Sequence, residues 1–288
     1  MPELPEVEVV KKSLETQINN LTIKSVQIND GNLRYKVKKQ DLLKTVGQKI
    51  IKMGRRSKYL LFFLNKGEII LAHLGMTGKF FIEDKKTSKR KTSFYYNLES
   101  YNKNHDRVII FLNNKSKLIY NDVRKFGFLK ICLKSKIQHN QHLKILGPEP
   151  LSKFFNFEYF KRYLVGKKRK IKDLLMDQKF LAGLGNIYVN EILFLSKIRP
   201  ERKISSLNNN EIKKIIFNTK KVLRKAISLG GSSIKDFSNI SGKKGNFQQE
   251  FNVYGKQGIK CSNSDCNKKV KRIVISNRAS FFCPKCQK

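Results

Sequence analysis

The first residues of the chain combine the groups needed for amine chemistry at a sugar. The sequence opens with Met1-Pro-Glu-Leu-Pro-Glu-Val-Glu8. A small residue after the initiator methionine favours removal of that methionine, which would leave Pro2 with a free secondary amine. An α-amine has an ordinary pKa of about 7.7–8.0, so a useful fraction is neutral and nucleophilic near pH 7. Attack of this amine on a sugar C1′ would give an iminium, and the adjacent Glu3 could transfer protons there.

The same stretch also has a purely structural interpretation. Pro5 suits the start of a helix, and acids such as Glu6 stabilise the first helical turn. The spacing of apolar residues predicts a helix over residues 3–20, with one apolar face made of Val7, Val10, Leu14 and Ile18. The octapeptide alone leaves both interpretations open, so the choice depends on the rest of the chain.

Four cysteines near the C-terminus have the spacing of metal ligands. Cys261-x4-Cys266 and Cys283-x2-Cys286 are separated by sixteen residues, 267–282. Two cysteine pairs at such spacings suit a closed, structural, tetrahedral zinc site. The segment between them alternates like a hairpin, which predicts a zinc ribbon with Arg278 at its tip.

Disulfides are the alternative use of these cysteines. Residues 2–8 are acidic, unlike a signal peptide, so we expect a reducing, cytoplasmic setting that favours metal binding. The fifth cysteine, Cys132, lies in an apolar strand pattern and is expected to be an inert core thiol.

The composition indicates a polyanionic partner. The 288 residues contain 61 Lys and Arg against 22 Asp and Glu, a formal charge of +39, and are 40% hydrophobic. Some of the lysines reflect a general richness in Lys, Asn and Ile, but nucleic acid remains the favoured partner. A membrane surface is second, although no run approaches 18 apolar residues; the densest is 59–64.

The order of patterns predicts an α+β protein. After the leading helix, short β patterns form a β-sandwich at 23–28, 59–64, 68–74, 79–83, 107–112, 117–120 and 126–133. Turn residues at Gly147-Pro-Glu-Pro150 mark a boundary. Helical patterns follow at 157–165, 171–178, 187–195 and 211–229. We therefore expect domains at 1–147, 148–249 and 250–288.

Some shorter motifs carry weaker signals. Gly183-Leu-Gly-Asn186 precedes a helix and suits a phosphate oxygen. His73 ends a strand pattern, where a satisfied core histidine is the common interpretation. Met76 and Phe126 would by composition be core residues. In a DNA enzyme they could instead fill the space left by an extruded base.

Taken together, these pieces resemble the formamidopyrimidine-DNA glycosylase family, bacterial bifunctional repair enzymes for oxidised purines. The similarity runs from Met1 to Lys288. Its most specific parts are Pro2-Glu-Leu-Pro-Glu6, Arg56-Ser-Lys58-Tyr-Leu, His73-Leu-Gly-Met76, Gly183-Leu-Gly-Asn186-Ile-Tyr and Arg278-Ala-Ser-Phe-Phe-Cys283.

The resemblance implies four catalytic residues. Pro2 would attack C1′ and Glu3 would donate and shuttle protons. Lys58 would assist β-elimination and Arg278 δ-elimination. The substrates would be 8-oxoguanine and formamidopyrimidines in double-stranded DNA, or abasic sites, and the enzyme would act as a monomer at the bacterial nucleoid.

The resemblance also implies the residues that bind DNA. His73 and Asn186 would complete a phosphate clamp with Lys58 and Arg278. Other matching positions fill the vacated base stack or contact DNA elsewhere: Met76, Arg124, Phe126, His105, Lys125 and Lys168. The implied fold is a helix plus β-sandwich, followed by a helix-two-turn-helix domain with a zinc-ribbon finger holding one structural Zn²⁺.

The chain departs from the family pattern at two places. The first cysteine pair is spaced x4 where x2 is usual, and Lys125 stands where many relatives carry arginine. Lysine keeps the charge but not the bidentate fork. Glu6 and Glu191 match further family acids near the site.

Two other functions stay open at this point. An endonuclease-VIII-type glycosylase shares the nucleophile, the acid and the zinc ribbon but removes oxidised pyrimidines. Leu4 and the residues Met76, Arg124 and Phe126 favour the purine enzyme. A non-catalytic zinc-ribbon protein that binds nucleic acid would explain the charge and the cysteines, but not Pro2, Glu3 and Lys58.

Overall fold

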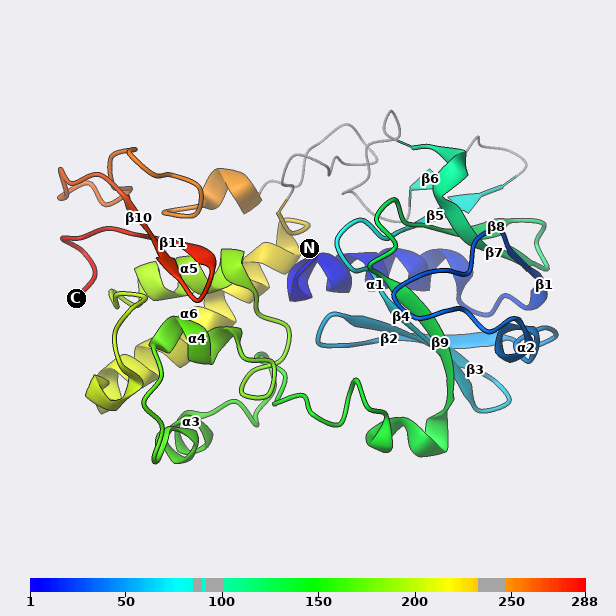
Figure 1. Cartoon of the computed structure of the whole chain (residues 1–288), viewed down its shortest axis with the longest axis horizontal. Helices are drawn as coiled ribbons and strands as arrows, with labels where there is room; N and C mark the ends of the chain where they lie inside the picture. The colour runs from blue at the N-terminus through cyan, green and yellow to red at the C-terminus, as the bar shows by residue number, and fades with distance from the viewer. Residues whose placement is uncertain (85–89, 92–100, 233–246) are drawn as a thin grey trace. The chain divides into compact units, whose positions relative to one another are not determined.

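The computed structural model divides the chain into two compact units (Figure 1). It describes residues 1–84, 90–91, 101–232 and 247–288. The N-terminal unit comprises Met1–Lys144 with Leu229–Gln248, and the C-terminal unit comprises Ile145–Ser228 with Gln249–Lys288. The division into three domains expected from the sequence is finer and stays a prediction.

The N-terminal unit begins with helix α1 (Leu4–Ile18). The Glu3 amide donates a hydrogen bond to the Glu6 carboxylate at 2.8 Å, which satisfies a backbone donor at the start of the helix. The expected apolar face is confirmed, because four side chains along it are buried: Val7, Val10, Leu14 and Ile18.

Two antiparallel sheets form the rest of this unit (Figure 1). The five-stranded sheet has the order β1-β7-β8-β5-β6, with β1 (Ile23–Ile28), β5 (Lys79–Glu83), β6 (Arg90–Lys91), β7 (Asp106–Leu112) and β8 (Lys117–Asn121). The four-stranded sheet has the order β2-β3-β4-β9, with β2 (Ile50–Arg56), β3 (Tyr59–Leu64), β4 (Glu68–His73) and β9 (Phe128–Leu133). Helix α2 (Lys39–Leu43) and two 3-10 turns (Lys103–His105 and Lys134–His139) lie outside the strands.

One apolar core joins α1 to both sheets, which makes the unit a sandwich. Leu14 of α1, Phe62 of β3 and Phe80 of β5 all belong to it. The Phe62 and Phe80 rings lie 5.5 Å apart and so link one sheet to the other. The predicted helix-plus-sandwich fold is confirmed.

The C-terminal unit consists of helices and a terminal hairpin. Its elements are α3 (Phe157–Leu164), α4 (Ile171–Met176), α5 (Asn186–Leu195), α6 (Asn209–Ser228), a 3-10 turn at Ile204–Ser206, and the hairpin β10 (Lys271–Ile275) with β11 (Arg278–Phe282). A further 3-10 turn, Phe247–Glu250, spans the point in the sequence where one unit gives way to the other. The four predicted helices are each present within a few residues. No helix in the described ranges combines the length and hydropathy needed to cross a bilayer.

Candidate active site

The start of α1 places the N-terminus among charged groups. Pro2 and Glu3 are buried and Met1 is exposed. Burial lowers the pKa of the Met1 α-amine, and the cations Lys58 and Arg124 act in the same direction, while Glu3 opposes them. A lowered pKa leaves more of the amine neutral near pH 7, which is the form that attacks carbon.

Lys58 lies in the tight turn between β2 and β3, and is 7% exposed. The preceding Ser57 adopts a left-handed φ of 54°. Arg55 donates to the Ser57 carbonyl at 2.9 Å and to the Glu8 carboxylate of α1 at 2.6 Å. Arg55 thereby fixes the turn that carries Lys58 against the helix that carries the N-terminus.

His73 ends β4 as a neutral imidazole. Burial lowers its pKa to about 4, and the charges of Lys58 and Arg34 contribute in the same direction. The Gly75 amide donates to Nδ1 of His73 at 3.1 Å. Nδ1 is therefore an acceptor and Nε2 carries the proton, so the ring can donate one hydrogen bond without carrying charge.

Met76, Arg124 and Phe126, which we call the wedge triad, lie on the surface. Met76 is 40% and Phe126 is 47% exposed, so neither is a core residue and that interpretation is wrong. The Arg124 guanidinium lies 4.7 Å from the centre of the Phe126 ring. Exposed apolar side chains beside an arginine suit insertion into a base stack.

Lys125 and His105 belong to one charged network. Asp30 pairs with Lys125 at 2.7 Å and with Arg107 at 3.1 Å. Arg107 also contacts Nδ1 of His105 at 3.2 Å. Because arginine only donates, Nδ1 accepts and Nε2 of His105 remains as a donor. Sequence reasoning missed Arg107 and Asp30, since neither carries a motif of its own.

In the C-terminal unit, the start of α5 lies against β11. The side-chain amide of Asn186 donates to the Ala279 carbonyl at 3.0 Å, and Ala279 directly follows the exposed Arg278. Lys172 donates to the same carbonyl at 2.8 Å and to the Ser280 hydroxyl at 2.6 Å. Asn186 and Arg278 are therefore brought together. Lys172 was not foreseen, because a single lysine in an apolar helix is usually solvated.

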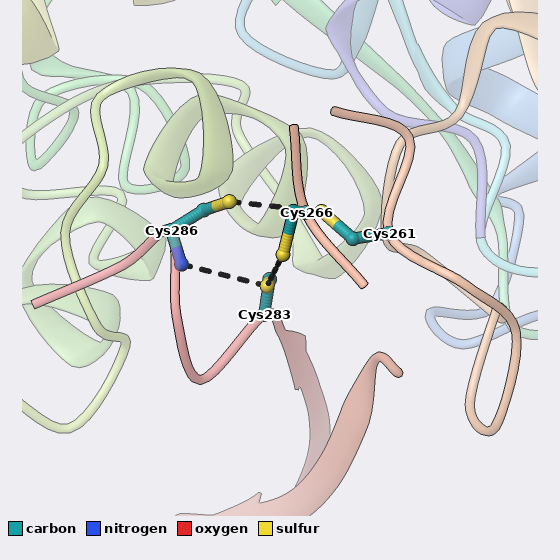
Figure 2. A group of neighbouring side chains, drawn as sticks. All are labelled: Cys261, Cys266, Cys283 and Cys286. Atoms are coloured by element: carbon teal, nitrogen blue, oxygen red, sulfur yellow. Dashed lines mark hydrogen bonds between the residues drawn. The ribbon is translucent and has the colours of Figure 1, made fainter. Parts of the chain in front are cut away.

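The four cysteine sulfurs converge on one point (Figure 2). All lie within 4.8 Å of one another, with 3.8 Å between Cys261 and Cys286 and 3.5 Å between Cys266 and Cys283. Metal–sulfur bonds of about 2.3 Å in a tetrahedron give sulfur–sulfur edges of about 3.8 Å. The four residues could therefore hold a metal ion.

Hydrogen bonds support this cysteine cluster. The segment between Cys261 and Cys266 is two residues longer than the expected x2 spacing, yet it turns back on itself, because the Cys266 backbone amide donates to the Asn263 carbonyl at 3.0 Å. The Asn263 side chain donates to the Cys286 sulfur at 3.6 Å. The buried Glu191 of α5 accepts from the backbone amides of 252–254, which fixes the approach to the cluster.

The candidate residues are divided between the units. The N-terminal unit holds Pro2, Glu3, Lys58, His73, Met76, His105, Arg124, Lys125 and Phe126. The C-terminal unit holds the exposed Lys168, Asn186, Arg278 and the four cysteines. Each unit thus carries part of the expected set.

Comparison with known proteins gives consistent similarities. Residues 1–129 match the family model of the formamidopyrimidine-DNA glycosylase N-terminal domain, and residues 146–238 match the H2TH domain of the same family. The chain is 38% identical to formamidopyrimidine-DNA glycosylase of Rhodopseudomonas palustris and 39% identical to that of Rickettsia bellii, each over all of both chains. Its fold is similar to Lactococcus lactis Fpg in complex with DNA containing an abasic site, with a TM-score of 0.85, 35% identity and 99% of both chains covered. A complex of a mutant L. lactis Fpg with Fapy-dG DNA matches with the same score and identity over 100% of both chains.

Proposed function

The chain belongs to the formamidopyrimidine-DNA glycosylase family, and from this we propose that it excises oxidised purines and cleaves the resulting abasic site. Its substrates would be 8-oxoguanine and formamidopyrimidines in duplex DNA. Relatives of known structure are complexes with DNA that contains an abasic site or Fapy-dG, which supports this choice.

The main support for this proposal comes from the groups that surround the N-terminus. Burial and nearby cations keep the pKa of the Met1 α-amine below the ordinary value of 8.0, and the neighbouring Pro2 and Glu3 are buried in the same surroundings. Once Met1 is removed, Pro2 would present a neutral secondary amine in this place. A nucleophile of this kind next to a carboxyl group suits displacement of a base from C1′.

The reaction would proceed through a covalent iminium. A base in the duplex shields C1′, so the damaged nucleotide must first leave the stack, at a few kcal/mol. The Pro2 nitrogen would form a bond to C1′ and lose its proton as the C1′–base bond breaks and the base leaves. The C1′–O4′ bond would then break while Glu3 gives a proton to O4′, which opens the sugar ring and leaves an iminium between Pro2 and C1′. The iminium then makes the C2′ proton acidic, so its removal expels the 3′ phosphate, with Lys58 assisting. δ-Elimination of the 5′ phosphate, assisted by Arg278, would follow.

Arg124 would read the base left behind. A guanidinium donates hydrogen bonds and accepts none. Orphaned cytosine offers the acceptors O2 and N3, whereas orphaned adenine places a donor amino group beside N1. A lost bidentate contact is worth about 1–3 kcal/mol, which corresponds to roughly a ten- to hundredfold preference for cytosine.

We assign the cysteine cluster to one structural Zn²⁺ per chain. Four thiolates leave no open ligand position, so the metal would hold the hairpin that carries Arg278 and take no part in bond breaking. The charge of +39 suits action on nucleoid DNA.

Single-turnover excision on matched duplexes tests the proposal. The duplexes carry 8-oxoguanine opposite cytosine or adenine, or thymine glycol, with Arg124→Ala beside the wild type. We expect fast excision opposite cytosine, slower excision opposite adenine, and loss of the difference in Arg124→Ala. A higher rate on thymine glycol would indicate an endonuclease-VIII-type enzyme, and equal rates opposite cytosine and adenine would remove Arg124 from its role.

A further inference from the structure

The two turns that carry the wedge triad share one buried carboxylate. Asp122 is 0% exposed and lies at the start of the turn that bears Arg124. Its Oδ2 accepts from the Gly127 amide at 2.8 Å, at the end of that same turn. Its Oδ1 accepts from the Thr77 hydroxyl at 2.5 Å, and Thr77 directly follows Met76.

Thr77 continues this connection to Arg124. Its hydroxyl oxygen accepts from the Arg124 amide at 3.0 Å while its proton goes to Asp122. One hydroxyl therefore joins the Met76 turn, the buried carboxylate and the backbone of Arg124.

Close backbone packing holds the same two turns together. Gly75 adopts a left-handed φ of 59°, and a Cβ there would overlap the backbone of Phe126 and Gly127. A Cβ at Gly127 would overlap the Tyr120 hydroxyl. Only glycine fits at these two positions, so the two turns pack with their backbones in direct contact.

The wedge triad is exposed, and the turn between Arg124 and Phe126 is strained. Met76 and Phe126 are exposed, and Lys125 between Arg124 and Phe126 has a left-handed φ of 58°, a conformation that costs energy in a non-glycine residue. Such a turn keeps its shape only when its surroundings fix it. The hydrogen bonds to Asp122 and Thr77 add to the backbone packing in fixing this turn against the turn of Met76.

We propose that Asp122 and Thr77 are positioning residues for recognition of the orphaned base, which hold Arg124 in a fixed place relative to Met76. The inference rests on the proposed function, because it concerns the same reaction. Neither residue would touch the reacting atoms. Their loss would let Arg124 shift, and donors aimed at cytosine O2 and N3 lose discrimination when their position varies.

The test compares Thr77→Val with Thr77→Ser. Valine keeps the shape but removes both hydrogen bonds of the hydroxyl, whereas serine keeps them. For Thr77→Val we expect the cytosine-to-adenine ratio of 8-oxoguanine excision to fall by about tenfold. Thr77→Ser should keep the ratio within about twofold of wild type. Asp122→Asn replaces one carboxylate oxygen by an amide NH2, which would face a group that donates to Asp122, so it should resemble Thr77→Val.

A second readout separates positioning from general destabilisation. Borohydride trapping on DNA that already contains an abasic site does not need base selection, so Thr77→Val should be trapped within about twofold of wild type. An unchanged ratio in Thr77→Val would overturn the inference. So would an equal loss of trapping and of excision opposite both bases, accompanied by a lower Tm. A wild-type chain that shows neither excision nor trapping would instead refute the proposed function, and this inference with it.

Discussion

At the scale of single residues, His73 could offer a DNA phosphate a hydrogen bond without carrying charge. Its pKa of about 4 means that the ring is neutral through the physiological range. The Gly75 amide occupies Nδ1, so Nε2–H is the donor that remains. A neutral donor contributes a hydrogen bond but releases no counterion when DNA binds.

The salt dependence of two variants should therefore differ. In His73→Ala, affinity for duplex DNA should fall while the slope of log affinity against log salt stays unchanged. In Arg278→Ala, the slope should become shallower by about 0.9, because one phosphate is no longer neutralised. Fluorescence anisotropy titrations at several salt concentrations measure both. A shallower slope in His73→Ala would mean that this histidine binds DNA in its charged form.

The N-terminal amine should titrate below the ordinary pKa of 8.0, because burial and Lys58 both disfavour its charged form. We expect the Pro2 amine, in the surroundings that lower the pKa of the Met1 amine, to do the same, so the rate of borohydride trapping on abasic DNA should rise with pH with a midpoint below 8. Lys58→Gln removes a neighbouring cation, so its rising limb should move to higher pH. Lys58→Arg keeps the cation and is the matched control. A limb that moves to lower pH in Lys58→Gln would contradict this electrostatic account.

At the scale of elements, alternation and helical periodicity predicted most of the fold. The helix over 3–20 and the four later helices appear close to their expected bounds. Strand β2 was missed, because Gly54 and the two arginines after it break the apolar pattern. Phe126 was expected inside a strand, yet β9 begins only at Phe128, because the preceding turn is bonded to Asp122.

The site was predictable only where a motif marked it. The cysteine spacing predicted a cluster, and the four sulfurs do converge. Contacts between residues far apart in sequence carried no such signal. Arg55 bonds Glu8, and Thr77 bonds Asp122, through side chains of ordinary composition. Such pairs depend on strand register, which a single sequence does not fix.

The hairpin of β10 and β11 should depend on the zinc ion that we propose for the cysteine cluster. Cys283 directly follows β11, which begins with Arg278, so loss of a ligand there should release the strand. Cys283→Ser is expected to lose zinc, expose residues 250–288 to proteolysis and weaken DNA binding. Cys132→Ser, which changes a cysteine in β9, should keep full zinc content. Elemental analysis and limited proteolysis measure these effects. Metal-free wild-type protein with full activity would contradict the assignment.

At the scale of the whole molecule, the charge of +39 exceeds what a few phosphate contacts require. If only Lys58, Lys125, Lys168 and Arg278 neutralise phosphates, the slope of log affinity against log salt should be about −3.6. The wider excess of positive charge should make it steeper, on undamaged as well as damaged duplex. Anisotropy titrations with undamaged DNA measure this slope. A nearly flat dependence would show that the lysine excess is compositional only.

We propose above all that the α-amine of Pro2 forms the covalent bond to DNA. Borohydride trapping on abasic DNA, followed by peptide mapping of the adduct, tests it most directly. We expect the DNA on the peptide that begins with Pro2, and an uncleavable N-terminal extension or Pro2→Gly should abolish or sharply reduce trapping while DNA affinity stays nearly intact. Efficient trapping with the extension retained, or an adduct on Lys58, would contradict the account.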